Sequence, residues 1–374
     1  MTYDSIFSYI GPSYIRVNQS AIRSQKQQEI EIQHEHDDIH GKVKKQLVEY
    51  PPYIPTGNVI FQIYSNELLV YLQQAYFTPL SFKDHIQARQ QANISASIRK
   101  KIQQHHLTIR VTDKSNNFYI GLTSEFKKKE QAYFNETNAY IQLNTNPFDE
   151  VLNKVIQLLN QLRSKRFILK WQYDQMMPDP KQTQLAHLYF NPKTHKNDIP
   201  VRPIISSLHS ATTKISKFLD SIIRPIFDAK CRQTTIIDGI SLIQDLQKYQ
   251  QLHRLKLTTL FCTFDISNLY TVLPQNESLN ILMEFLHVHG YRKVKGVPLD
   301  AIRKLASIVI KENVFVYDKK YFKQILGGAM GSSFTLTLAN IFMWKWQREL
   351  VRIQDITGEY FGRYVYHILL VNKI

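Results

Sequence analysis

Cysteine is scarce in this sequence, because Cys231 and Cys262 are the only two cysteines among 374 residues. Their separation matches neither a zinc-ligand spacing nor a disulfide framework. The sequence therefore excludes a cysteine-ligated zinc domain and a disulfide-rich secreted domain. A reducing intracellular compartment, either the nucleus or the cytoplasm, is the expected setting.

Long apolar segments are also missing. No run of about 18 apolar residues, the length that a membrane helix needs, occurs in the chain. The N-terminus has no basic region followed by an apolar stretch, so the sequence predicts neither a membrane span nor a signal peptide. Hydrophobic side chains make up 43% of the residues, which is sufficient for a large core divided among two or three lobes.

Acidic side chains are outnumbered by basic ones. Lys and Arg total 47 against 31 Asp and Glu, a formal net charge of +16. Residues 161–232 contain 13 basic and 5 acidic side chains, so half of the excess lies in less than a fifth of the chain. Such a concentration favours a polyanionic partner, above all nucleic acid. The alternative is an ordinary solvated surface, and charge alone does not decide between them.

The chain divides by composition into three parts. Residues 1–57 are polar and end in a proline-rich segment, which predicts a flexible arm and linker. Within this arm His34, His36 and His40 stand among acidic residues, but their spacing matches no closed metal site, and solvated charges are the simpler interpretation. Residues 58–108 have apolar positions at helical spacing and predict a helical region without legible chemistry.

Local patterns in the remainder predict a mixture of helices and strands. A packing helix is expected after Asn146 as its N-cap, with Pro147 at the first helical position. An amphipathic helix is expected over residues 212–227, kinked or shortened by Pro225. The segment "LFCTFDI" reads as a buried strand that ends at Asp265, and "NVFVYDKKYFKQ" reads as a hairpin.

Three segments contain candidate residues for binding or catalysis. Asp265 at a strand end indicates a cation site, although a turn or capping aspartate is the more common explanation. Gly327, Gly328 and Gly331 precede an apolar helix and permit close approach of a ligand, but an ordinary tight connection explains them equally well. "YFNPKTHKNDIPVRPIIS" concentrates basic residues in a hairpin that suits phosphate or simply a basic surface. Its basic residues are Lys193, His195, Lys196 and Arg202.

The order of these segments is more specific than any one of them. "DKSNN" from Asp113, "NPKTHKNDIPVRPIIS" from Asn191, "FDISNLYTVLP" from Phe264 and "AMGSSFTLTLANIFM" from Ala329 resemble successive blocks of Penelope-like reverse transcriptases. The resemblance covers residues 109–370. These enzymes are similar to the telomerase catalytic subunit, so the resemblance implies an α+β fold in residues 109–374. Fingers and a partial palm of a right-hand polymerase, with an antiparallel sheet flanked by helices, would follow the helical N-terminal region.

The resemblance also implies an activity and site residues. The family's reaction is RNA-directed DNA synthesis, with an RNA template, a DNA primer and deoxynucleotides as partners and Mg²⁺ as cofactor. By position, Lys193 and Arg202 would bind the nucleotide triphosphate, and Asp265 would be the first catalytic, metal-binding carboxylate. Tyr270 would select against a ribose 2′-hydroxyl. Met330 and Gly331 would line the nascent base pair.

The sequence departs from the family at its second metal motif. Where the family has Tyr-x-Asp-Asp, this chain reads "RYVYHILLV", so Tyr366 and His367 occupy the two aspartate positions. A phenol binds Mg²⁺ poorly and an imidazole prefers softer metals, so we expect impaired polymerisation. Ser115 and Ser333 are further departures, and the thumb and endonuclease of the family are expected to be absent. The alternatives are a non-catalytic RNA- or DNA-binding module and a relic without a selected role.

Overall fold

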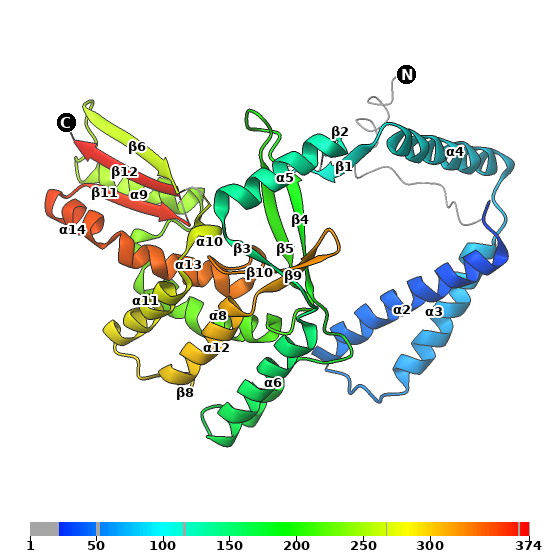
Figure 1. Cartoon of the computed structure of the whole chain (residues 1–374), viewed down its shortest axis with the longest axis horizontal. Helices are drawn as coiled ribbons and strands as arrows, with labels where there is room; N and C mark the ends of the chain where they lie inside the picture. The colour runs from blue at the N-terminus through cyan, green and yellow to red at the C-terminus, as the bar shows by residue number, and fades with distance from the viewer. Residues whose placement is uncertain (1–21, 50–52, 115–116, 267, 366, 374) are drawn as a thin grey trace. The chain divides into compact units, whose positions relative to one another are not determined.

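The computed structural model describes residues 22–49, 53–114, 117–266, 268–365 and 367–373 (Figure 1). The chain divides into two compact units, Met1–Leu107 and Thr108–Ile374. This division lies one residue from the predicted boundary between residues 58–108 and 109–374. Among the described residues, no helix has the length and apolar character required to span a bilayer.

Unit 1, Met1–Leu107, is helical where it is described. Its helices are α2 (Gln25–Glu49), α3 (Ile60–Phe77) and α4 (Phe82–Gln104). Helix α2 differs from the prediction, because residues 25–49 were expected to belong to a flexible arm. Its glutamine, glutamate and lysine residues have high helix propensity, and Ile32 is buried. The polar composition was misleading, because a helix that buries only a narrow stripe of side chains can be polar over most of its surface.

Two histidines join α2 to α3. His36 Nε2 lies 2.9 Å from Ser65 Oγ, and His40 Nε2 lies 3.1 Å from the Phe61 carbonyl oxygen. The two imidazole rings stack at 5.6 Å, as expected for residues four apart on a helix. These contacts show that the two histidines pack between the helices, and no group of three metal-ligating side chains occurs in the described part of the chain.

Unit 2, Thr108–Ile374, alternates helices and strands, which confirms the mixed α+β part of the predicted fold class. Its helices are α5 (Thr123–Thr137), α6 (Phe148–Ser164), α7 (Lys170–Met176), α8 (Thr213–Lys230), η2 (Arg232–Thr234), α9 (Gly239–Gln251), α10 (Leu269–Val272), α11 (Gln275–Val288), α12 (Leu299–Lys311), α13 (Ser333–Trp346) and α14 (Arg348–Thr357). Its strands, the first of which starts at the unit boundary, are β1 (Leu107–Val111), β2 (Phe118–Leu122), β3 (Tyr140–Leu143), β4 (Ala186–Pro192), β5 (Val201–Ser206), β6 (Thr259–Asp265), β7 (Lys293–Val294), β8 (Val297–Pro298), β9 (Val314–Tyr317), β10 (Lys320–Gln324), β11 (Tyr360–Tyr364) and β12 (His367–Lys373).

Two sheets dominate unit 2. A five-stranded sheet has the order β3-β10-β9-β4-β5, and a three-stranded sheet has the order β11-β12-β6. In Figure 1 the five-stranded sheet lies near the centre of this unit and the three-stranded sheet at the end that carries the C-terminus. The long helices α8, α11, α12 and α13 form one hydrophobic core with α6, and the five-stranded sheet packs an aromatic core against α5.

Several local predictions are confirmed. Asp318 and Lys319 both have positive φ, 46° and 62°, in the two-residue turn between β9 and β10. That is the conformation of a hairpin turn that matches strand twist. Asn146 Oδ1 accepts a hydrogen bond from the Phe148 N–H at 3.0 Å, so it satisfies a donor at the start of α6 as expected, but Phe148 is the first helical residue and Pro147 stands at the N-cap, one position later than predicted. Pro225 does not shorten α8, which continues to Lys230 because other contacts of its buried face hold it.

The prediction of a buried strand ending at Asp265 is wrong. Strand β6 is at an edge of its three-stranded sheet. Thr259 is half-buried, and all the residues from Leu260 to Asp265 are exposed. Phe261 is 54% exposed and Phe264 38%. An apolar sequence favours a strand but does not say how many neighbours cover it, so burial was overestimated.

Candidate functional site

The β4–β5 hairpin presents two cationic side chains beside a buried carboxylate. Arg202 lies opposite Asn191 in the antiparallel register, and its Nη1 is 3.1 Å from Asp113 Oδ1. The Asp113 side chain is only 2% exposed, and its backbone N–H donates to the Pro192 carbonyl at 3.0 Å. A buried carboxylate is costly without a charged partner, so Asp113 and Arg202 hold each other beside the loop that connects β4 and β5.

Lys193 stands next to this pair. Burial lowers its pKa below the ordinary value, and the positive charges of Arg202 and Lys196 lower it further, while Asp113 and Asp265 act in the opposite direction. Its backbone N–H donates to the Pro200 carbonyl at 2.8 Å and keeps the hairpin closed. A half-buried ammonium under these influences gains free energy when an anion such as a phosphate approaches.

The glycine-rich segment ties this hairpin to the segment that follows β6. Gly327 and Gly328 donate their N–H groups to the carbonyls of Leu273 and Tyr270 at 2.7 and 2.8 Å. Gly331 has a φ of +113°, and a Cβ there would lie 2.8 Å from the Ile205 carbonyl oxygen. The Ile205 N–H donates to the Met330 carbonyl at 3.2 Å. Glycine is therefore required here by close backbone approach.

A hydroxyl-rich cavity of about 320 Å³ adjoins Gly331. Eight serine and threonine residues line it, from the end of β5 and from the starts of α8 and α13: Ser206, Ser207, Ser210, Thr212, Thr213, Ser216, Ser332 and Ser333. The single lysine in its lining is Lys217. Hydroxyl groups, helix N-termini and one ammonium are typical contacts for a phosphodiester backbone.

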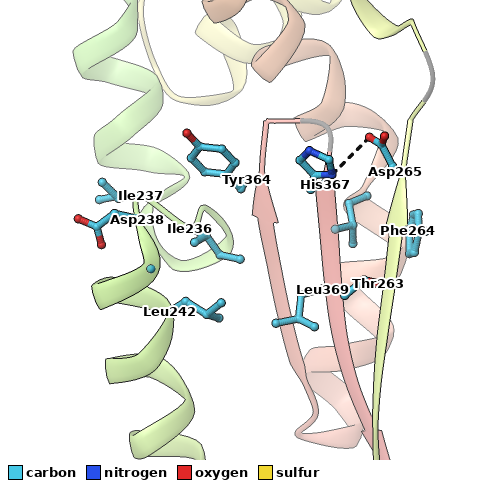
Figure 2. A pocket seen from close by; sticks show the side chains of 12 residues that line it. Ile236, Ile237, Asp238, Leu242, Thr263, Phe264, Asp265, Tyr364, His367 and Leu369 are labelled. Carbon is cyan, nitrogen blue, oxygen red and sulfur yellow. Dashed lines mark ion pairs between the residues drawn. The ribbon is translucent and has the colours of Figure 1, made fainter. Parts of the chain in front are cut away.

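Asp265 meets His367 at the other side of the site. The two residues are register partners in the β6–β12 ladder, and His367 Nδ1 lies 3.5 Å from Asp265 Oδ1. Figure 2 shows the two side chains pointing toward each other at one end of a mostly apolar cavity of about 720 Å³. Ile236, Leu242 and Leu369 contribute to its walls. Both polar side chains are about half exposed, at 55% for His367 and 46% for Asp265.

Arg363 is a site residue that sequence reasoning missed. Its side chain is fully buried and donates to Gln347 Oε1 at 2.6 Å, to Asn340 Oδ1 at 2.7 Å and to the Val365 carbonyl at 2.7 Å. Burial lowers the pKa of this guanidinium to about 10. Because Val365 lies in the turn before His367, Arg363 fixes the β11–β12 hairpin to helix α13. The sequence signal that could have pointed to this residue is its position in "GRYVYH", four residues before His367.

The described residues around Asp265 do not fit Mg²⁺. Magnesium takes oxygen ligands in near-octahedral geometry, usually from several carboxylates, phosphates and waters. Here the side chain that faces Asp265 is an imidazole, and no group of three His, Cys, Asp or Glu side chains occurs within the described ranges. Asp238, which lines the same cavity, accepts the Ser241 N–H at 2.7 Å as the cap of α9.

The sequence-predicted residues thus fall into one region of unit 2. Lys193 and Arg202 lie on the β4–β5 hairpin, and the charge of Asp265 raises the pKa of Lys193. Met330 and Gly331 contact β5, and Tyr270 accepts a hydrogen bond from Gly328. Tyr366 lies outside the described residues. Asp113 belongs to the "DKSNN" segment but had no predicted role, because its partner is 89 positions away in sequence and only folding reveals the contact.

Comparisons with known proteins concern the fold. No protein-family model and no curated protein matches the chain. Telomerase from Candida albicans, solved in complex with a TWJ fragment of telomeric RNA, superposes with a TM-score of 0.51 at 11% identity over 100% of this chain and 64% of that chain. Telomerase from Candida tropicalis, solved with the same kind of RNA fragment, gives 0.50 at 11% identity over 100% and 61%.

These similarities define a class of fold and no more. The mixed α+β architecture resembles the fold of these telomerases. The chain spans less than two thirds of the length of these two telomerase chains. An identity of 11% shows the fold alone, so activity and partners rest on the residues of the site.

Proposed function

We propose that unit 2 is a reverse-transcriptase domain of the Penelope-like kind that binds nucleic acid and has lost useful polymerisation. The observation that carries this proposal is the contrast around Asp265. Arg202 is held in place by the buried Asp113, with Lys193 beside this pair, whereas the partner of Asp265 across the strand pair is His367. Phosphate binding needs the first arrangement, and phosphoryl transfer by two metal ions needs carboxylates in the second.

The proposed roles follow the positions of the side chains. The β4–β5 hairpin would act as part of the fingers, where Lys193 and Arg202 contact phosphates. The sheet of β6, β11 and β12 would be the palm. Met330, Gly331 and the hydroxyl-rich cavity would line an RNA strand, and Tyr270 would stand beside the position of an incoming nucleotide. The telomerase structures that share the fold contain RNA, which supports an RNA partner.

The proposed loss of activity follows from electrostatics. Two divalent cations are normally held by several carboxylate oxygens, and their positive charge stabilises the transferring phosphoryl group. With Tyr366 and His367 in the positions of two aspartates, two negative charges are removed, so Mg²⁺ binding would be weak. We therefore expect a rate lower by several orders of magnitude than that of an intact site.

Binding of single-stranded RNA at a series of salt concentrations tests this function. Measured by fluorescence anisotropy, the logarithm of the affinity should fall linearly with the logarithm of salt concentration, since phosphate contacts release counterions. Deoxynucleotides with Mg²⁺ should leave the affinity unchanged. Affinity that is absent at low salt, or insensitive to salt, would contradict the proposed interface. Affinity that rises with nucleotides would contradict the proposed loss of nucleotide chemistry.

A further inference from the structure

Asp265 and His367 form a pair of potential metal ligands that a reverse-transcriptase site does not normally contain. Register partners in an antiparallel ladder project to the same face of the sheet, and Figure 2 shows the two side chains pointing toward each other among the residues that line one cavity. About half of each side chain is exposed, so an ion from solvent reaches both without rearrangement of the core. Their closest nitrogen and oxygen atoms, Nδ1 and Oδ1, are 3.5 Å apart.

This separation suits a tetrahedral ion. Zinc binds histidine nitrogen and carboxylate oxygen at about 2.0 to 2.2 Å, so two such ligands 3.5 Å apart would subtend an angle of about 110° at the metal. In an octahedral magnesium site, neighbouring oxygen ligands at about 2.05 Å lie only about 2.9 Å apart. The ligand chemistry agrees with the geometry, because imidazole binds zinc, cobalt, nickel and copper far better than magnesium.

We propose that Asp265 and His367 together bind one divalent transition-metal ion of the zinc class. The two side chains supply two ligands, and water or a phosphate oxygen supplies the others. The charge of Asp265 raises the pKa of Lys193, so the carboxylate and the ammonium interact. The positive charge of this ammonium disfavours a bare cation at Asp265 and favours a phosphate oxygen as an additional metal ligand. The inference concerns the same edge as the proposed function, yet it does not require that RNA binds.

The direct test is a titration of the full chain with Co²⁺, followed by visible absorption, and with Zn²⁺ in equilibrium dialysis. The chain should carry Cys262→Ser, because this exposed thiol is a competing soft ligand. We expect one metal equivalent with tetrahedral cobalt bands. His367→Ala and Asp265→Asn should each weaken binding about tenfold or more. His253→Ala, a change at an exposed histidine away from the site, should leave binding unchanged.

A matched variant tests which metal ion the site prefers. His367→Asp should reduce the affinity for Co²⁺ and Zn²⁺ relative to Mn²⁺, since it replaces nitrogen by oxygen. Metal binding that is equal in the His367, Asp265 and His253 variants, or undetectable in the unmodified chain, would overturn the proposal. Circular dichroism verifies that each variant is folded, and a metal-induced shift of the His367 ring signals in nuclear magnetic resonance gives a measurement that needs no variant.

Failure of this proposal remains separable from failure of the proposed function. RNA affinity measured on the same proteins without added transition metal should survive His367→Ala, because this residue contacts phosphate only through the proposed metal ion. Conversely, removal of the cations at Lys193 and Arg202 should weaken RNA binding while cobalt still binds. Loss of RNA binding in both variants would instead indicate a fold defect, which the circular dichroism spectra would detect.

Discussion

The two sheets of unit 2 differ in how completely they are covered. In the five-stranded sheet, β4 alternates buried and outward side chains, and Phe190 is fully buried among aromatic rings. In the three-stranded sheet, β6 forms an edge and leaves Phe261 54% exposed. The first sheet supports Lys193 and Arg202, and the second supports Asp265 and His367.

This difference in coverage explains why Lys193 and Arg202 would be retained while residues beside Asp265 are replaced. The cations rest on a hairpin whose inward face is part of a packed core, so selection for stability also preserves their positions. The end of the three-stranded sheet that carries Asp265 and His367 is exposed, and substitutions at exposed positions change the free energy of unfolding little. The proposed replacement of metal ligands at positions 366 and 367 is therefore compatible with an intact fold and with the proposed phosphate contacts of Lys193 and Arg202.

The largest effect is expected for Phe190→Ala. The Phe190 ring packs within 6 Å of the rings of Tyr133, Phe134 and Tyr317, at centroid distances of 5.7, 5.9 and 5.7 Å. Its loss should lower the free energy of unfolding by about 3 to 5 kcal/mol in chemical denaturation. The matched change Phe261→Ala on β6 should cost less than about 1 kcal/mol. Equal costs would show that the two sheets are equally covered.

A smaller effect is expected for Arg363→Met. This change leaves buried acceptors on Gln347, Asn340 and Val365 without their donor, while it removes the cost of a buried charge. We expect a net loss of about 2 kcal/mol in the free energy of unfolding. Arg352→Met, at an exposed ion pair with Glu349, should leave the denaturation midpoint unchanged. An unchanged midpoint for the Arg363 variant would refute its role as an anchor.

The cationic hairpin is tested by the double change Lys193→Gln and Arg202→Gln. Loss of two phosphate contacts should weaken RNA binding about 10- to 100-fold at low salt, and the slope against salt should decrease by about 1.4 for a single strand. Lys293→Gln with Lys295→Gln removes the same charge from an exposed turn of unit 2 and serves as control. If both pairs weaken binding equally, net charge rather than this hairpin determines affinity.

The smallest effect is a dependence of RNA binding on pH. Because burial and neighbouring cations lower the pKa of Lys193, it loses its proton at a lower pH than an ordinary lysine. RNA affinity should therefore be full at neutral pH and fall as the pH rises toward the ordinary lysine value. Lys193→Arg keeps its charge throughout this range and should remove part of the decline. Identical profiles for the two proteins would exclude Lys193 as the titrating group.

Sequence patterns predicted several of the local elements that carry the candidate site, because these elements are encoded in short segments. The hairpin of Lys193 and Arg202 and the turn at Asp318 and Lys319 follow from alternation and turn chemistry, which act over few residues. The contact of Asp113 with Arg202 and the anchor Arg363 depend on packing between distant segments, so no local pattern contains them. Helix α2 and the exposed edge at β6 were misjudged because burial depends on neighbours.

Primer extension tests the central claim most directly. An RNA template annealed to a DNA primer, with Mg²⁺ and deoxynucleotides, is supplied to the unmodified chain, to Asp265→Ala and to the double variant Tyr366→Asp with His367→Asp. We predict that the unmodified chain binds the hybrid in a salt-sensitive manner and extends no primer. Extension by the unmodified chain that disappears in Asp265→Ala would contradict the claim, because another group would then complete a working metal site.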